Sequence, residues 1–183
     1  KRGEILGIGG LAGQGKIGIA NGIMGLFPST GDVKKNGDAI TLNAARASLD
    51  NGMAFVSEDR RGTGLLLDDS IEFNIVATAI QVQGKFLTPG RVSILDSKAM
   101  TEHATNMIKE LDIRCTGPGQ LTRRLSGGNQ QKVCIARAII LEPNLLFVSE
   151  PTRGIDIGAK KLILDHLVKL NRDNGLTIVM TSS

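Results

Sequence analysis

Aromatic side chains are scarce in this chain, and it has no long run of like-charged residues. It contains no Trp, no Tyr and only five Phe among 183 residues. RNA loops and single strands are bound largely by stacking bases on aromatic rings, so the composition argues against nucleic acid as a partner. The formal net charge is +4, but the basic residues are scattered in doublets that form no basic arm.

Cysteine and histidine are also rare. Cys115, Cys134, His103 and His166 lie too far apart in the sequence to give a metal-ligand spacing, which favours a reduced, cytosolic setting over a disulfide framework. No apolar run approaches the roughly 18 residues of a spanning helix, and the first residues do not resemble a signal peptide. Any membrane role is therefore expected to be peripheral.

The remaining pattern predicts one α/β domain with a mainly parallel sheet. A buried strand at 5–8 should lead through a glycine loop into a helix that runs to about Phe27. Further strands are expected at 39–42, 53–57, 145–148 and 176–180. The core is predicted at 1–69 and 141–183, and a mainly helical insertion at about 70–140. Because the chain begins on one strand and stops inside another, we expect a piece of a longer protein.

Gly10-x-x-x-x-Gly15-Lys16 follows the first strand and precedes a helix. Glycines in this spacing let successive N–H groups turn toward a polyphosphate, and Lys16 can reach its outer phosphates. The natural ligand is a purine nucleoside triphosphate. Such loops usually continue with a Ser or Thr that binds Mg²⁺, whereas Ile17 offers no oxygen.

A second departure follows the strand at 145–148, where an Asp would usually face the metal and Ser149 stands instead. We therefore expect Mg²⁺ to be held weakly. Glu150 comes next and can orient and deprotonate an attacking water, although a surface glutamate at a turn is the alternative interpretation. Because glycine loop, strand and Glu-Pro-Thr occur in this order, the catalytic interpretation is favoured.

The run from Leu125 to Lys132 is another anion-binding pattern. Ser126 can cap a helix whose first residues, Gly127 and Gly128, would expose bare N–H groups to phosphate oxygens. An ordinary capped helix is the alternative.

Together with Val148 to Asp156, these motifs resemble the nucleotide-binding domain of ATP-binding cassette (ABC) transporters over nearly the whole chain. The variants Leu-Ser-Gly-Gly-Asn-Gln-Gln-Lys, Ser-Glu-Asp-Arg-Arg at 57–61 and Thr-Arg-Gly-Ile-Asp at 152–156 look most like importers of simple sugars such as ribose and galactose. In that subfamily the ATPase carries two cassettes in tandem, and the altered positions resemble its second, degenerate half.

The resemblance implies that the glycine loop of one cassette and the Ser126 motif of another enclose the same ATP. It also implies a transmembrane permease that touches the helical insertion, a solute-binding protein that acts indirectly, and a place on the cytoplasmic face of the plasma membrane. Glu58 would stand where other cassettes sense the γ-phosphate, and Ser182 where they carry a switch histidine. The nucleotide positions implied are Gly10, Leu11, Ala12, Gly13, Gln14, Gly15, Lys16, Ile17, Glu58, Ser126, Gly127, Gly128, Asn129, Gln130, Asp156 and Ser182.

Two functions remain open from the sequence. One is an ATP-hydrolysing motor that drives solute import, and the other is a degenerate module that completes the partner's site without hydrolysis. A repair-type ABC protein is disfavoured because 64–125 lacks sustained heptads, and a GTPase because no Asn-Lys-x-Asp motif occurs.

Overall fold

The computed structural model describes the whole chain except residues 12, 91 and 183. Its centre is a parallel sheet with the strand order β1-β6-β5-β4. Val148 of β5 pairs with Val56 on one side and Met180 on the other, so the strand ends lie in register. The strands are β1 (Ile5–Gly9), β4 (Met53–Val56), β5 (Leu145–Ser149) and β6 (Thr177–Ser182).

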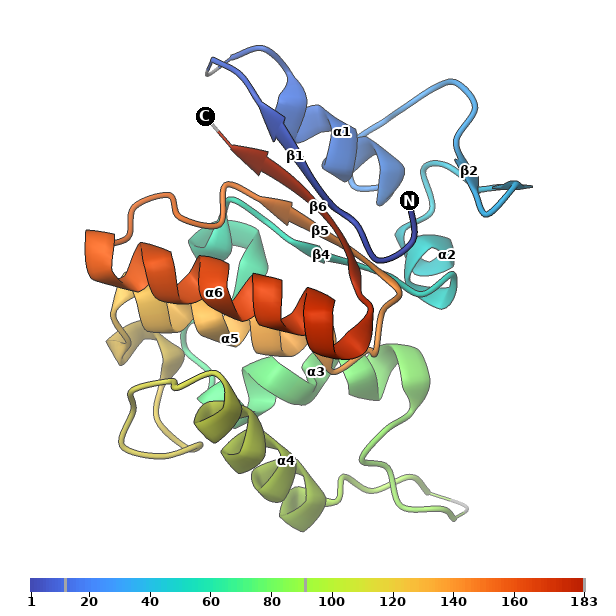
Figure 1. Cartoon of the computed structure of the whole chain (residues 1–183). Coiled ribbons are helices and arrows are strands. Elements are labelled where there is room, and N and C mark those ends of the chain that lie inside the picture. Colours follow the sequence, from blue (N-terminus) through green and yellow to red (C-terminus); the bar gives the residue numbers. More distant parts are fainter. Residues whose placement is uncertain (12, 91, 183) are drawn as a thin grey trace.

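Helices cover both faces of this sheet (Figure 1). One face carries α1 (Lys16–Ile23) and α2 (Ala45–Asp50), beside the short hairpin of β2 (Lys34–Lys35) and β3 (Asp38–Ala39). The other face carries α5 (Gly127–Ile139) and α6 (Ile157–Asn174). Helices on both faces of a parallel sheet are the arrangement expected for an α/β chain, and the predicted fold class is confirmed.

A third helical layer lies beyond α5 (Figure 1). It consists of α3 (Ile71–Gln83) and α4 (Ser97–Glu110), with the short turns η1 (Arg60–Gly64) and η2 (Thr122–Arg124) on the connections. One cluster of buried side chains joins these helices to the sheet, and it includes Ile75 of α3, Ile135 of α5 and Leu146 of β5. The extra helices therefore share the core of the sheet.

Side-chain caps define where the long helices start. Ser70, Asp96, Ser126 and Asp156 each accept a hydrogen bond from the backbone N–H three residues later. This satisfies one of the unpaired donors at each helix start. The expected start after Ser126 is confirmed, and Ser70 caps the first helix of the predicted helical insertion.

Two local predictions were wrong. The first helix ends at Ile23 instead of about Phe27, because Gly25 has φ +74° and a Cβ there would lie 2.6 Å from the backbone nitrogen of Ala44. Such a close approach admits only glycine. The strand expected at 39–42 is reduced to β3, and α2 was not predicted because its six residues carry no apolar periodicity.

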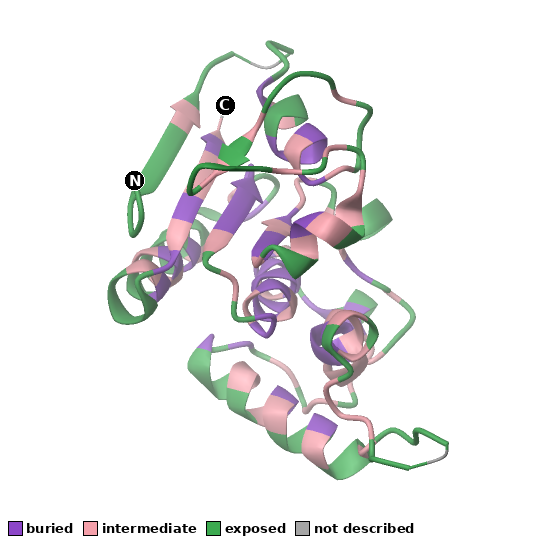
Figure 2. Ribbon diagram, turned by 90° about the vertical axis from the view of Figure 1, so that its right-hand side faces the viewer, coloured by how far each residue is buried: buried purple, intermediate pink, exposed green. Residues whose placement is uncertain are grey.

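The edge strand β1 is mostly exposed, whereas β4 and β5 are buried (Figure 2). Among the helices of residues 1–11, 13–90 and 92–182, none combines the length and apolar character needed to cross a membrane.

Truncation of Leu146 tests the assignment of the core shared by the sheet and the outer helices. Its side chain is fully buried on β5, so Leu146→Ala should lower the free energy of unfolding by about 2–5 kcal/mol. Leu164→Ala on the exposed side of α6 is the matched control, with an expected loss below about 1 kcal/mol. Urea unfolding followed by circular dichroism measures both, and equal effects would contradict the assignment of the core.

Candidate functional site

The carboxyl ends of the four parallel strands meet at one edge of the sheet. β1 leads into the glycine loop, β5 into Glu150, β4 into the segment with Glu58, and β6 ends at Ser182. Ligands in open parallel sheets bind at this edge, beyond the strand ends.

The glycine loop is shaped by left-handed backbone and by Lys16. Gly13 and Gly15 have φ of +86° and +76°, which glycine adopts without steric cost. The Lys16 ammonium group donates to the carbonyl oxygens of Gly10 and Leu11, at 2.9 and 3.1 Å. Gln14 Oε1 accepts the Leu11 N–H at 3.1 Å. The loop therefore curls around its own lysine at the start of α1.

Lys16 faces Glu150 across the strand ends. Lys16 Nζ lies 3.8 Å from Glu150 Oε1, and the two side chains are only 7% and 9% exposed. Charges this far removed from water are retained in proteins only when paired or hydrogen-bonded. Lys16 is a cation that can bind phosphate, and Glu150 is a carboxylate that can act as a base. The two groups lie next to each other.

A cavity of about 640 Å³ adjoins this pair, so the burial of Lys16 leaves room for a ligand. Four predicted site residues besides Lys16 and Glu150 line it: Gly13, Gly15, Ile17 and Ser182. Three more belong to the motif at 152–156 but were not predicted to contact a ligand: Thr152, Arg153 and Gly154. The sequence did not single out the last lining residue, Lys160. Lys160 adds a cation from α6, and its place in an ordinary amphipathic helix gave no signal for this.

Two buried hydroxyl groups at the same edge lack partners in the described part of the chain. They are Ser149 Oγ on β5 and Thr181 Oγ1 opposite it on β6. Among the described residues, no group of three or more His, Cys, Asp or Glu could hold a metal. The donors therefore fit a hard cation such as Mg²⁺ poorly, because Ser149 offers one neutral oxygen and Ile17 none.

Glu150 has a strained backbone. Its φ is +46°, a left-handed conformation that costs a residue other than glycine about 1–2 kcal/mol. Pro151 follows, and a proline favours extended backbone at the residue before it. The Glu150 N–H donates to the Thr181 carbonyl at 2.9 Å, and its carbonyl accepts the Arg153 N–H at 3.1 Å. Strain of this kind concentrates at functional sites.

The Ser126 motif forms a second, separate pocket of about 300 Å³, which Asp156 also lines. Ser126 Oγ accepts from the backbone N–H and the side-chain amide of Asn129, at 3.4 and 3.0 Å. The Arg114 N–H fixes that amide by donating to Asn129 Oδ1 at 3.0 Å. Because both acceptor positions of the exposed Ser126 hydroxyl are occupied, its proton is available for donation to a ligand.

Six of the predicted nucleotide residues in the described part of the chain line neither pocket: Gly10, Leu11, Gln14, Glu58, Gly127 and Gln130. Gln130 is buried and its amide donates to the Thr122 carbonyl at 3.3 Å, so this side chain stabilises the start of α5 from its buried face. Gly127 lies against Arg60, and Glu58 is half-buried with Oε2 unpartnered among the described residues. Ala12 lies outside the described residues.

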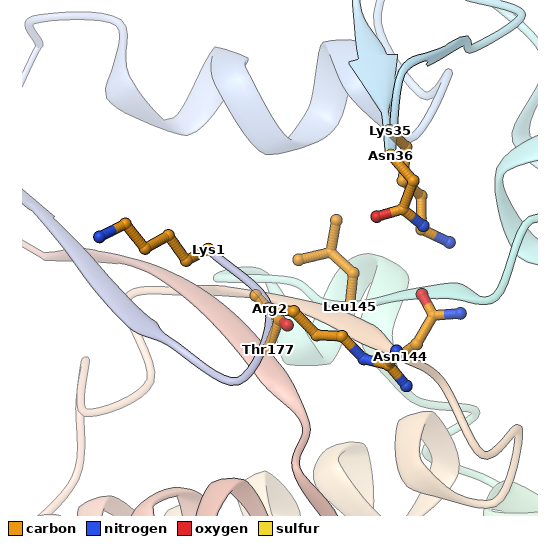
Figure 3. Close-up of a pocket in the computed structure, with 7 residues that line it drawn as sticks. All are labelled: Lys1, Arg2, Lys35, Asn36, Asn144, Leu145 and Thr177. Carbon is orange, nitrogen blue, oxygen red and sulfur yellow. The ribbon is translucent and has the colours of Figure 1, made fainter.

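Another pocket, of about 390 Å³, opens at the opposite edge of the sheet, at the amino ends of β5 and β6 (Figure 3). Lys1, Arg2 and Lys35 give it a basic lining. It contains none of the motif residues, and its position at the strand starts is the wrong edge for a ligand of a parallel sheet.

The sequence matches the family model described as "ABC transporter" over residues 1–153. The chain belongs to the ABC transporter family. This confirms the resemblance drawn from the motifs at 10–16, 125–132 and 148–156.

Curated relatives of this ABC cassette are sugar import proteins. It is 35% identical to the ribose import ATP-binding protein of Caldanaerobacter subterraneus subsp. tengcongensis over 184 residues, covering 100% of the chain and 36% of that protein. It is 40% identical to the xylose import ATP-binding protein of Thermoanaerobacter pseudethanolicus over 185 residues, covering 100% of the chain and 35% of that protein. The cassette thus spans about a third of the length of these relatives.

Solved structures share its fold. An ATP-binding cassette in a dimeric post-hydrolysis state with ADP and phosphate superposes with a TM-score of 0.79 at 25% identity, covering 100% of this chain and 75% of that one. A nucleotide-free cassette from an ABC transporter also gives 0.79, at 21% identity, covering 100% of this chain and 72% of the other.

Gly128 tests how closely α5 and α6 approach at the Ser126 pocket of this ABC cassette. A Cβ on Gly128 would lie 2.8 Å from the Ala159 methyl carbon, so Gly128→Ala should force the helix starts apart and destabilise the fold by about 1–3 kcal/mol. Gly18→Ala is the control, because its Cβ would meet nothing within 4 Å and should be neutral or stabilising. Urea unfolding compares them, and a neutral Gly128→Ala would refute the close packing.

Proposed function

We propose that this chain is the ATP-binding and ATP-hydrolysing motor cassette of an importer. The observation that carries the proposal is the buried approach of Lys16 to Glu150 beside a cavity bounded by the glycine loop. A polyphosphate in that cavity would meet the N–H groups of the loop and the cations Lys16 and Lys160. Glu150 would stand beside the outermost phosphate, where it can take a proton from an attacking water.

The solute is proposed to be a simple sugar or a related small molecule. Both curated relatives quoted above are named for sugar import, of ribose and of xylose. Such names favour the motor over the degenerate module. In this arrangement the cassette works with a transmembrane permease at the cytoplasmic face of the plasma membrane, and a solute-binding protein acts indirectly. The helical part at about 70–140 is proposed to make the permease contact.

A second cassette is proposed as the direct partner. The residues of the Ser126 motif do not line the cavity beside Lys16, so one chain offers two half-sites in different places. A head-to-tail pair would bring the exposed Ser126 hydroxyl of one cassette to the phosphates held by the other. The dimeric relative with ADP and phosphate supports this pairing. Asp156 would then belong to the interface.

Magnesium is proposed as a weakly held companion of ATP. With Ile17 in place of a hydroxyl residue and Ser149 in place of a carboxylate, most ligands of the ion would have to be phosphate oxygens and water. Ser182 lines the cavity where a histidine would otherwise face the γ-phosphate.

ATP affinity tests the binding half of this proposal. In the intact protein, Lys16→Ala should weaken ATP binding at this cassette about tenfold or more, because a charge-assisted contact to phosphate is lost. Removal of Mg²⁺ by EDTA should weaken it by a smaller factor. Lys161→Ala, an exposed lysine next to the cavity-lining Lys160, is the control. Titration with a fluorescent ATP analogue gives these affinities, and unchanged binding by Lys16→Ala would remove the basis of the proposal.

Turnover tests the catalytic half. Glu150→Gln keeps the shape of the side chain but removes its basicity, so ATP hydrolysis should fall about 100-fold or more while ATP binding persists. Steady-state phosphate release by the intact protein, with the other cassette silenced by the equivalent substitution of its own glutamate, measures this. No hydrolysis with only the partner silenced, together with unchanged hydrolysis and sugar uptake when Glu150→Gln is made beside an active partner, would support a non-hydrolysing module instead.

A further inference from the structure

The side chain of Arg60 connects the segment at 57–61 to the segment at 152–156. Arg60, from the segment at 57–61, reaches the turn that connects β5 to α6. Its Nη1 donates to the Arg153 carbonyl at 2.7 Å, and its Nη2 donates to the Gly154 carbonyl at 3.2 Å. A planar guanidinium can hold two adjacent acceptors at once, which fixes the orientation of both peptide groups. The contact joins residues more than 90 positions apart.

The surroundings of Arg60 are closely fitted. A Cβ on Gly127, at the start of α5, would lie 3.2 Å from Arg60 Nη2 and 3.2 Å from the Gly154 carbonyl oxygen. Because Gly127 has no side chain, the Arg60 guanidinium can pack against the start of α5. Arg60 Nε is buried without a partner among the described residues, and burial lowers the pKa of this guanidinium. A cation is desolvated here in order to reach two backbone carbonyls.

The turn that Arg60 holds is the one that begins with the strained Glu150. Glu150 adopts φ +46° directly before a proline, and its carbonyl accepts the Arg153 N–H. A strained residue keeps its conformation only when several contacts fix the segment around it. The β6 strand fixes the front of this turn through the Thr181 carbonyl, and Arg60 fixes the far end at Arg153 and Gly154.

We infer that Arg60 is a positioning residue. By fixing the backbone of the 150–154 turn, it orients the Glu150 carboxylate for its role in ATP hydrolysis. The inference rests on the proposed function of Glu150. Arg60 lines neither of the two pockets and acts through the backbone of the turn. Loss of the guanidinium should leave ATP held by the glycine loop but misplace the base.

Hydrogen exchange of the intact protein tests the positioning itself. Arg60→Lys keeps the charge but not the two-pronged geometry, and Arg60→Met removes both. Both variants should raise exchange at 152–156, above all at the Arg153 amide, and leave the strands β5 and β6 protected. Arg61→Met is the matched control, because Arg61 is the exposed neighbour with the same charge. Unchanged exchange at the turn in both Arg60 variants would overturn the inference.

Kinetics of the same proteins test the consequence. Arg60→Met should lower kcat for ATP about tenfold or more, with KM changed by less than about twofold. The kcat of Arg60→Lys should lie between those of Arg60→Met and the wild type. In a Glu150→Gln background the Arg60 effect should disappear, because both changes act on the same step. A raised KM alone, or an equal loss in the Glu150→Gln background, would contradict a role through Glu150.

The two proposals fail in different ways. If Glu150→Gln lowers turnover but neither Arg60 variant does, the positioning role is wrong and the motor function stands. If Glu150→Gln leaves turnover unchanged, the proposed function is wrong and the inference falls with it. Should Arg60→Met not fold, Arg60→Lys alone decides both measurements.

Discussion

The approach of Lys16 to Glu150 is the contact on which the rest of the site depends. It requires that the residues after β1 and β5 reach the same edge of the sheet, although the strands are separated in the sheet by β6. A parallel arrangement satisfies this, because all strand ends then face one way. The same buried charges need polar neighbours, which the loop carbonyls of Gly10 and Leu11 supply to the ammonium group.

The turn from Glu150 to Asp156 connects the two pockets of the cassette. Its first half lines the cavity beside Lys16, and Asp156 lines the pocket of Ser126. Asp156 also caps α6 by accepting the Ala159 N–H at 2.9 Å. A short turn that lines both pockets gives a physical route by which ligand binding at one pocket can affect the other, provided that its backbone moves as a unit.

Much of the fold was accessible from local sequence. Capping residues, apolar strands bounded by glycines and the order of elements predicted the α/β class and the helix starts after the glycine loop and Ser126, because these signals act over a few residues. The α1 end and α2 were missed for the opposite reason. Gly25 ends the helix where the chain passes close to the backbone of Ala44, and that approach is a tertiary contact.

For the candidate site, the sequence by itself determined the chemical groups: a glycine loop with Lys16, a carboxylate after a buried strand, and a capped glycine pair at Ser126. These are short motifs whose residue types follow from local backbone and hydrogen-bonding needs. Only the tertiary structure decided which side chains share a pocket. It turned Gln130 inward, added Lys160 to the cavity and joined Arg60 to the carbonyls of Arg153 and Gly154. Such contacts depend on how helices and strands pack across the core, which no local pattern encodes.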